Sequence, residues 1–203
     1  YINYYGVKCG NNAVIFTSND DAYETAISLH NKDVRIEAII DIREQSGGDL
    51  PKKCKELGIK ILWKSTVVYT EGYKKITKVH VMKLSEDNRS TIGNKLKIKC
   101  DLLSVSGGYT PAIHLFTQSG GKLTFNEKKH CFQPKLTPPN QISVGSCNGT
   151  FNLKNIIEES QKKTNEFLKL NHDNQINISE SINGSFENIW LLPSDKISGK
   201  TKS

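Results

Sequence analysis

The stretch AVIFTSNDDAYETAISL, residues 13–29, decides the fold, because it joins a short apolar strand, a tight polar turn and an amphipathic helix. This is the order found where a dinucleotide meets an α/β sheet. The usual fingerprint of that turn, G-x-G-x-x-G/A, uses its glycines for the turn, for close approach of the backbone to pyrophosphate and for helix packing. Thr17, Asn19 and Ala22 hold those places here. The sequence therefore predicts the outline of a nucleotide-binding unit without its glycines.

The turn also carries negative charge where a phosphate would bind. Asp20, Asp21 and Glu24 stabilise the amino terminus of a helix through its dipole, but they repel a pyrophosphate at the same place. Ser18 and Asn19 are good N-cap residues, and their side chains would crowd a phosphate. We therefore expect a vestigial loop that caps a helix.

Composition excludes several classes of partner. The 203 residues carry a formal net charge of +7, but only Arg35, Arg43 and Arg89 are arginines, and the lysines are scattered. Proteins that read nucleic-acid phosphates concentrate arginines and aromatic residues on one face, so we expect no nucleic acid. No apolar run approaches the roughly 20 residues of a membrane span, so we expect no membrane partner. The five cysteines show no C-x-x-C spacing, which favours a reducing compartment and a cytoplasmic location.

The segments after residue 29 continue the alternation of strand and helix. We expect a second strand in RIEAIIDI (35–42), a turn and short helix in GGDLPKKCKELG (47–58), and a third strand in IKILW (59–63). The β-α-β-α-β order predicts a parallel sheet with right-handed crossovers. The predicted fold class is therefore α/β, with a Rossmann-like parallel sheet.

An antiparallel insertion is predicted next. TVVYTEG (66–72), KKITKVHVMKL (74–84) and KLKIKCDLLSVS (95–106) are rich in β-forming residues and are separated by turn signals. The last of these segments ends as a buried strand that runs into a Gly-rich loop.

The second half of the chain contains another predicted strand-loop-helix unit. We expect a short helix in PAIHLFTQSGG (111–121), a Pro-rich break in FQPKLTPPNQ (132–141), and a strand followed by a loop in ISVGSCNGTF (142–151), which leads into a helix over residues 153–170. From residue 171 the sequence is polar and unpatterned, which predicts a linker or disorder.

Five residues are candidates for cofactor binding: Asp41, Gly107, Gly108, Gly145 and Ser146. Asp41 ends the second strand at the spacing where an acidic residue binds an adenosine ribose, although a strand-end aspartate can instead cap a turn. Gly107 and Gly108 permit close approach of a ligand, and a plain tight turn explains them equally well. Gly145 and Ser146 lie in a loop before a long helix, where backbone amides either face an anion or form a tight βα turn.

No catalytic residue and no metal ligand is predicted. Cys147 stands at the entrance of a helix, but no base can be assigned to it from the sequence. The five histidines show no metal-ligand spacing.

Four stretches taken together resemble the alpha subunit of heterotetrameric sarcosine oxidase and its relatives, a branch of the two-dinucleotide-domain flavoprotein superfamily. The resemblance covers roughly residues 1–160, and the long block around SGGYTPAIHLFTQSGGKL carries most of its weight. The four stretches are VIFTSNDDAYETA (14–26), IIDIRE (39–44), CDLLSVSGGYTPAIHLFTQSGGKLTFNEKKHCFQP (100–134) and ISVGSCNGTFNL (142–153).

The resemblance implies two nested Rossmann-like domains, of which the inserted one has a degraded glycine fingerprint. The chain is then expected to be an internal fragment. Residues 1–11 would connect the two domains, residues 12–122 would form the inserted degenerate NAD-binding-like domain, residues 123–170 would return to the first domain, and residues 171–203 would be a linker or disordered tail.

The resemblance also implies a function. The whole flavoenzyme would demethylate sarcosine oxidatively to glycine, with this part supporting dinucleotide binding and the assembly of a hetero-oligomer. NAD would bind mainly before Tyr1, and FAD or FMN and folate elsewhere in the complex. In the wider superfamily an A-G-D loop touches the dinucleotide near its pyrophosphate, and Val144, Gly145 and Ser146 hold the matching places, so that a hydroxyl replaces the carboxylate.

Two other functional classes stay open. One is a NAD(P)H-dependent flavin oxidoreductase of the pyridine nucleotide-disulfide type, which needs a working nicotinamide loop at Thr17 to Asn19. The other is a non-catalytic scaffold domain.

Overall fold

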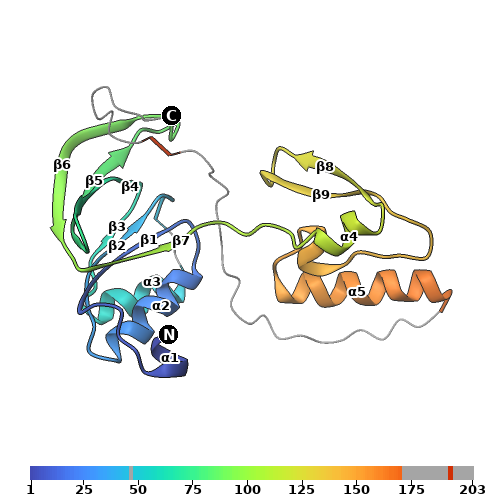
Figure 1. Cartoon of the computed structure of the whole chain (residues 1–203), viewed down its shortest axis with the longest axis horizontal. Coiled ribbons are helices and arrows are strands. Elements are labelled where there is room, and N and C mark those ends of the chain that lie inside the picture. The colour runs from blue at the N-terminus through green and yellow to red at the C-terminus, as the bar shows by residue number, and fades with distance from the viewer. Residues whose placement is uncertain (46–47, 171–191, 194–203) are drawn as a thin grey trace. The chain divides into compact units, whose positions relative to one another are not determined.

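The structure is a computed structural model that describes residues 1–45, 48–170 and 192–193. Residues 1–108 form one compact unit, which begins with the short helix α1 (Ile2–Tyr5), and residues 109–170 belong to a second unit (Figure 1). The predicted domain boundaries, including the one after residue 122, stay predictions. Most of the tail predicted from residue 171 lies outside the described residues.

A parallel sheet forms the centre of the first unit (Figure 1). Its strands are β1 (Asn12–Thr17), β2 (Arg35–Asp41), β3 (Ile61–Leu62) and β7 (Leu102–Ser106), in the order β3-β2-β1-β7. Each neighbouring pair is parallel. The predicted α/β class with a parallel sheet is therefore confirmed. Helical crossovers return β2 and β3 in the direction of β1, and the antiparallel insertion precedes β7.

Helices α2 (Asp21–His30) and α3 (Asp49–Glu56) pack on this sheet. Ala22 and Ala26 are four residues apart, so they lie on one face of α2, and their small side chains allow the helix to approach the strands closely. The N-cap of α2 is Asp20, not Ser18 or Asn19 as the sequence predicts. The helix starts later because Ser18 and Asn19 are bound to the end of a neighbouring strand.

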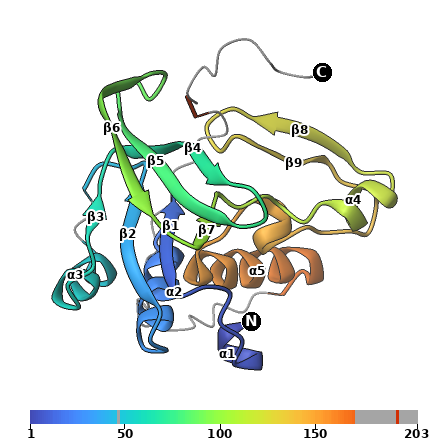
Figure 2. The same cartoon turned by 60° about the vertical axis from the view of Figure 1, so that its left-hand side comes forward.

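Three antiparallel strands, β4 (Ser65–Gly72), β5 (Ile76–Leu84) and β6 (Thr91–Lys99), form a second sheet (Figure 2). Val79 and Val81 of β5 are buried against Val14 and Ile40 of the parallel sheet. This confirms the antiparallel insertion. The unit therefore has three layers, with helices, parallel strands and antiparallel strands in that order.

The chain passes from one sheet to the other at Asp101. The sequence predicts a single segment over residues 95–106, but Asp101 Oδ1 accepts hydrogen bonds from the backbone N–H groups of Asn11 at 3.0 Å and Asn12 at 2.7 Å. These bonds tie the segment to the start of β1. As a result β6 and β7 are separate strands in different sheets.

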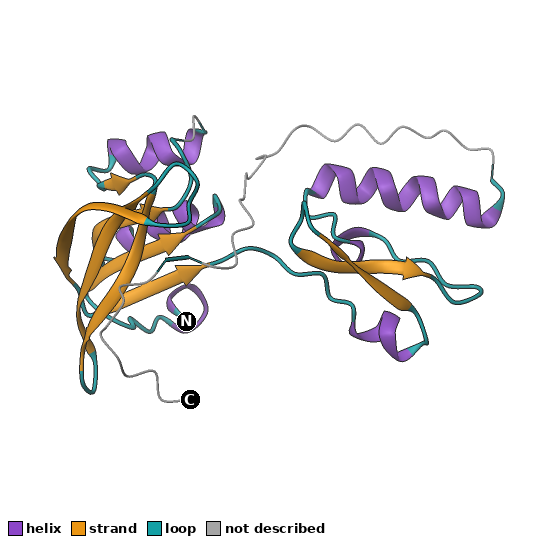
Figure 3. Cartoon of the chain, turned by 90° about the horizontal axis from the view of Figure 1, so that it is seen from above, coloured by secondary structure: helices purple, strands orange, loops and turns teal. Residues whose placement is uncertain are grey.

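The second unit contains helix α4 (His114–Gln118), strands β8 (Lys122–Asn126) and β9 (Cys131–Leu136), the 3-10 turn η1 (Gly145–Asn148) and helix α5 (Leu153–Leu168) (Figure 3). The β8–β9 hairpin is missing from the sequence-based prediction, which expects a Pro-rich break from residue 132. Pro134 lies within β9, and a two-stranded sheet accepts proline because each of its strands is an edge.

The strand predicted at the start of ISVGSCNGTF (142–151) is wrong, whereas the loop and the long helix after it are confirmed. Val144 has extended backbone angles, φ −136° and ψ 157°, but residues 145–148 turn into η1. A strand also needs a neighbour, and within the described part of this unit β8 and β9 pair only with each other. The segment before η1 therefore forms no strand in the described part of this unit, although Val144 itself is extended.

Candidate functional site

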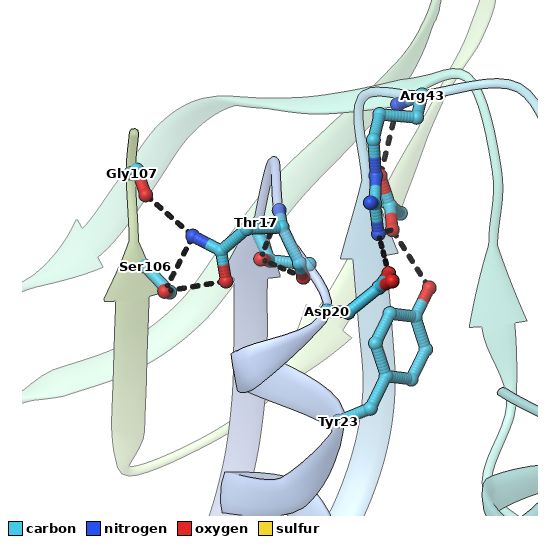
Figure 4. Close-up of polar contacts among 8 residues, drawn as sticks. Thr17, Asp20, Tyr23, Arg43, Ser106 and Gly107 are labelled. Atoms are coloured by element: carbon cyan, nitrogen blue, oxygen red, sulfur yellow. Dashed lines mark hydrogen bonds and ion pairs between the residues drawn. The ribbon is translucent and has the colours of Figure 1, made fainter. Parts of the chain in front are cut away.

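The turn after β1 lies where a Rossmann-like unit holds its ligand, at the carboxyl ends of the parallel strands (Figure 4). Thr17 and Asn19 are both almost fully buried. Thr17 Oγ1 accepts a hydrogen bond from the backbone N–H of Asn19 at 3.0 Å and donates one to the Asn19 carbonyl at 2.9 Å. The Thr17 hydroxyl and the backbone of Asn19 thus satisfy each other within the turn.

The Asn19 side chain also joins β1 to β7. Its Nδ2 donates to Ser106 Oγ at 2.9 Å and to the Gly107 carbonyl, and its Oδ1 accepts from Ser106 Oγ at 3.1 Å (Figure 4). The crevice between the ends of these two strands is where the strand order reverses, and it is the usual place of a dinucleotide. Here an amide side chain of the protein spans it.

Gly107 and Gly108 follow β7 with backbone angles that need no glycine, since neither has a positive φ. A Cβ added at Gly107 would meet no atom within 4 Å. The carbonyl of Gly107 accepts a hydrogen bond from Asn19 in the turn after β1, but the structure gives no steric reason for a glycine at residue 107. Their role in cofactor binding stays a prediction.

Asp41, the candidate ribose ligand, is fully buried at the end of β2. Its Oδ1 accepts from the backbone N–H of Arg43 at 2.9 Å and from Arg43 Nε at 3.0 Å. Its Oδ2 accepts from Arg43 Nη2 at 2.7 Å and from the Tyr23 hydroxyl at 2.7 Å. The bond from the backbone of Arg43 is the turn-capping alternative, and a ribose could bind Asp41 only after Arg43 released it.

Arg43 lies between two carboxylates. Its Nη2 is 2.7 Å from Asp41 Oδ2 and 2.8 Å from Asp20 Oδ1, and its side chain is only 8% exposed (Figure 4). Burial disfavours the charged guanidinium, but the hydrogen bonds and charge of Asp41 and then of Asp20 outweigh it and raise the pKa of Arg43. Burial, followed by the charge and hydrogen bond of Asp41, raises the pKa of the Tyr23 hydroxyl. The network holds Arg43 charged and Tyr23 neutral.

The sequence analysis names Asp20 and Asp41 but gives Arg43 no role. The only local signal is the spacing of Arg43 two residues after a strand-end aspartate. The structure brings Asp20, Tyr23, Asp41 and Arg43 together and leaves Gly145 and Ser146 in the second unit. A hollow of about 550 Å³ in the first unit lies at the amino-terminal end of β2, where Arg35 and Ile36 contribute to its lining.

In the second unit, Gly145 is buried with φ +69°, and Ser146 is exposed. The backbone N–H of Gly145 donates to Glu159 Oε2 of α5 at 3.2 Å. The anion that faces this amide is therefore a carboxylate of the same unit. Ser146 is the candidate residue here whose side chain is open to solvent.

Among the described residues no group of three or more His, Cys, Asp or Glu side chains is arranged to hold a metal ion. Within the same part of the chain, each helix is too short or too polar to cross a membrane. All five cysteines are described, and they are free thiols.

Comparison with known proteins supplies the family. The chain is 32% identical over 153 residues to the alpha subunit of sarcosine oxidase from Corynebacterium sp. (strain P-1), an alignment that covers 74% of this chain. It is 33% identical over 132 residues to the alpha subunit of sarcosine oxidase from Rhizobium meliloti (strain 1021), which covers 65% of this chain. The chain is a relative of the sarcosine oxidase alpha subunit. The resemblance read from the sequence is thereby confirmed.

The chain spans only 15% of the length of the first of these alpha subunits and 12% of the second. No family model matches it. Its relation to sarcosine oxidase therefore concerns one stretch of a much longer subunit.

Solved structures agree on the fold. Thioredoxin reductase from T. acidophilum matches with a TM-score of 0.59 at 18% identity, over 82% of this chain and 53% of the reductase. The HOCl-induced flavoprotein disulfide reductase RclA from Escherichia coli matches with a TM-score of 0.55 at 14% identity, over 79% of this chain and 37% of RclA. At these identities the likeness concerns the fold, and it confirms the Rossmann-like α/β class for this sarcosine oxidase relative.

Proposed function

We propose that this chain is part of the alpha subunit of a sarcosine oxidase-type flavoenzyme. The complete enzyme oxidises sarcosine, or a similar N-methyl amino acid, and releases the demethylated amino acid. The observation that carries the proposal is the identity of 29–33% to three sarcosine oxidase alpha subunits over 65–74% of the chain. No residue of this chain is proposed as catalytic. NAD, a flavin and folate are proposed for the complete complex.

Residues 12–122 are proposed to act as a scaffold derived from a dinucleotide-binding domain. The buried side chains of the first unit support this role, because Asn19 spans the crevice between β1 and β7 and Arg43 occupies the carboxylate of Asp41. Each of these contacts would have to open before a dinucleotide bound there. Such a domain positions its neighbours within the subunit and contributes to subunit assembly.

Residues 123–170 are proposed to return to a first dinucleotide domain that lies elsewhere in the polypeptide. Two features of this segment support the idea. Val144, which has extended backbone angles, has no partner strand in the described part of the unit, and α5 has no buried residue. Both features are expected of a segment that completes a sheet and a core made by other residues. Gly145 and Ser146 would then lie beside the dinucleotide.

The main alternative is a NAD(P)H-dependent flavin oxidoreductase of the pyridine nucleotide-disulfide type. The fold likeness to thioredoxin reductase favours it. It needs an open loop at Thr17 to Asn19, and the burial of these residues argues against that.

Calorimetric titration of the chain with NADH separates the two candidates. Under the scaffold proposal we expect no micromolar binding to the first unit. Micromolar binding that Asp41→Ala abolishes would favour the reductase and contradict the scaffold role. The activity itself is tested by sarcosine-dependent oxygen consumption of the polypeptide that carries this chain, purified with its co-expressed subunits. Oxygen consumption with NADH but not with sarcosine would contradict the proposal.

A further inference from the structure

We propose that Glu159 and Gln133 are positioning residues that fix the turn η1 from opposite sides, so that Ser146 is presented outward. The inference rests on the proposed function, in which this turn lies beside the dinucleotide. It deepens that function because it assigns the roles within the turn. Glu159 and Gln133 hold it, and Ser146 is the group left for the ligand.

The first side of the turn is held by the carboxylate of Glu159, which projects from α5. Its Oε2 accepts from the backbone N–H of Gly145 at 3.2 Å, and its Oε1 accepts from Asn148 Nδ2 at 2.5 Å. Thr150 adds a third hydrogen bond. Burial alone would raise the pKa of Glu159, but the bonds from Thr150, Asn148 and Gly145 outweigh it and lower that pKa. The carboxylate is thus held in its charged form by three donors of the turn.

The second side of the turn is held by the β8–β9 hairpin. Gln133 Nε2 donates to the carbonyl of Asn148 at 2.8 Å, and Lys129 Nζ donates to the carbonyl of Gly149 at 2.8 Å. Gln133 is itself fixed, because its Oε1 accepts from Asn126 Nδ2 at 2.7 Å. Gln133 of the hairpin and Glu159 of α5 therefore both form hydrogen bonds with Asn148 of the turn.

These contacts require glycine at residues 145 and 149. Gly145 has φ +69° and Gly149 has φ +76°, a region that favours glycine. A Cβ at Gly149 would overlap the amide of Gln133, and a Cβ at Gly145 would lie 3.1 Å from Ile156 Cγ2. The turn is thus fixed in backbone angle and in position at both ends. Ser146, between them, is exposed.

This arrangement also accounts for the hydroxyl at residue 146. Relatives with A-G-D at this loop carry a carboxylate there, and Ser146 replaces it. Glu159 of α5 also places a carboxylate against this turn, but that carboxylate accepts hydrogen bonds from the protein itself. Because the Gly145 amide is already engaged, we assign the outward contact to Ser146 rather than to the Gly145 backbone.

The test uses an exchange of hydrogen-bonding groups. Glu159→Gln replaces one acceptor by an NH₂ group and removes the negative charge, so the Asn148 amide either faces another donor or turns over into a weaker, neutral hydrogen bond. The double variant Glu159→Gln/Asn148→Asp restores one donor for each acceptor and keeps the net charge. Glu158→Gln on the exposed side of α5 is the matched control.

Amide exchange of the turn and the chemical shift of the Gly145 N–H are measured for each variant of the chain. We expect exchange at residues 145–150 to rise about tenfold or more in Glu159→Gln, as for a lost hydrogen bond to a charged group, and to return in the double variant. The pH titration of the Gly145 shift should disappear in Glu159→Gln and remain in Glu158→Gln. If exchange does not rise, or the double variant does not restore it, the positioning role is wrong.

NAD affinity of the complete polypeptide gives a separate answer. The positioning role predicts weaker binding in Glu159→Gln, recovery in the double variant and weaker binding in Ser146→Ala with unchanged exchange. Unchanged affinity in Ser146→Ala would overturn the assignment of the outward contact. If the wild-type polypeptide does not bind NAD, the proposed function fails, while the exchange and rescue experiments still decide whether Glu159 positions the turn.

Discussion

At the scale of single residues, the guanidinium of Arg43 compensates two buried carboxylates of the first unit. It bonds to Asp41, which is fully buried, and to Asp20, which is 6% exposed. Removing one partner of a buried ion pair leaves the other charge unpaired in a medium of low dielectric constant. The stability of the first unit should therefore depend on Arg43 far more than on a surface arginine.

We expect Arg43→Met to lower the free energy of unfolding by about 3 to 5 kcal/mol, measured by urea denaturation. Arg35→Met is the control, because Arg35 pairs with Glu37 at 3.1 Å but has a side chain that is 76% exposed. Exposed pairs of this kind contribute about 0 to 1 kcal/mol. Similar losses in both variants would contradict the structural role of the Arg43 network.

Asn19 provides a second test at this scale. Asn19→Ala removes the bonds to Ser106, which is half-buried, and to the carbonyl of Gly107, which is exposed. We expect a loss of about 1 to 3 kcal/mol in the free energy of unfolding, since each hydrogen bond contributes about 0.5 to 1.5 kcal/mol. Asn94→Ala, on the exposed part of β6, should change it little. A loss no greater than in this control would show that Asn19 does not tie β1 to β7.

At the scale of elements, the antiparallel sheet carries its own electrostatic contact between β4 and β5. Glu71 Oε2 lies 2.9 Å from Lys78 Nζ, and Glu71 Oε1 lies 2.6 Å from His80 Nε2. The hydrogen bonds of Lys78 and then of His80 lower the pKa of Glu71 from 4.5 to about 2. The depressed pKa means that the contact stabilises the sheet above pH 4.5, and that this stabilisation is lost as the pH falls toward 2.

We predict that the Glu71 carboxyl carbon, followed by NMR, titrates near pH 2 in the wild type. Lys78→Met should move its midpoint upward, toward the value of an isolated glutamate. A midpoint that Lys78→Met leaves unchanged would mean that the ion pair does not form in solution.

The elements also show which parts of the fold can be predicted from the sequence. The β-α-β-α-β order, the antiparallel insertion and the helix after Asn152 follow from local periodicity, and the structure has them. The Asn19–Ser106 contact joins residues 87 positions apart, and local patterns hold no information on such pairs. The strand predicted before Gly145 fails for a similar reason, because strand formation depends on a neighbour that the described part of the unit does not provide.

Less of the candidate site than of the fold could be predicted from the sequence. The missing glycines at Thr17 and Asn19 predict a closed loop, and both residues are buried. The spacing of Asp41 leaves both ribose binding and turn capping open, and the position of Arg43 favours the second. In the turn η1, the sequence identifies Gly145 and Ser146 but not Glu159, which bonds to the Gly145 amide from 14 residues further along the chain.

At the scale of the whole chain, the two units differ in how much apolar surface they bury. The first unit has a continuous core on both faces of its parallel sheet. In the second, Ile142 is 39% exposed, Phe167 is 51% exposed, and α5 has no buried residue. Full burial of one such side chain stabilises by about 1.5 to 3 kcal/mol. A few of them are thus comparable with a domain's total stability of roughly 5 to 15 kcal/mol.

If residues 123–170 complete a domain made elsewhere in the polypeptide, the chain alone should protect its two units unequally. Hydrogen exchange should find slow amides in the strands near Ile15, Ile39 and Leu103, because these strands are paired on the buried parallel sheet. Amides from about Asn140 onward should exchange faster than those strands, because α5 and the segment before it lack the residues that would cover them. Equal protection in both units would show that the second unit is stable by itself, and the nested-domain proposal would then be wrong.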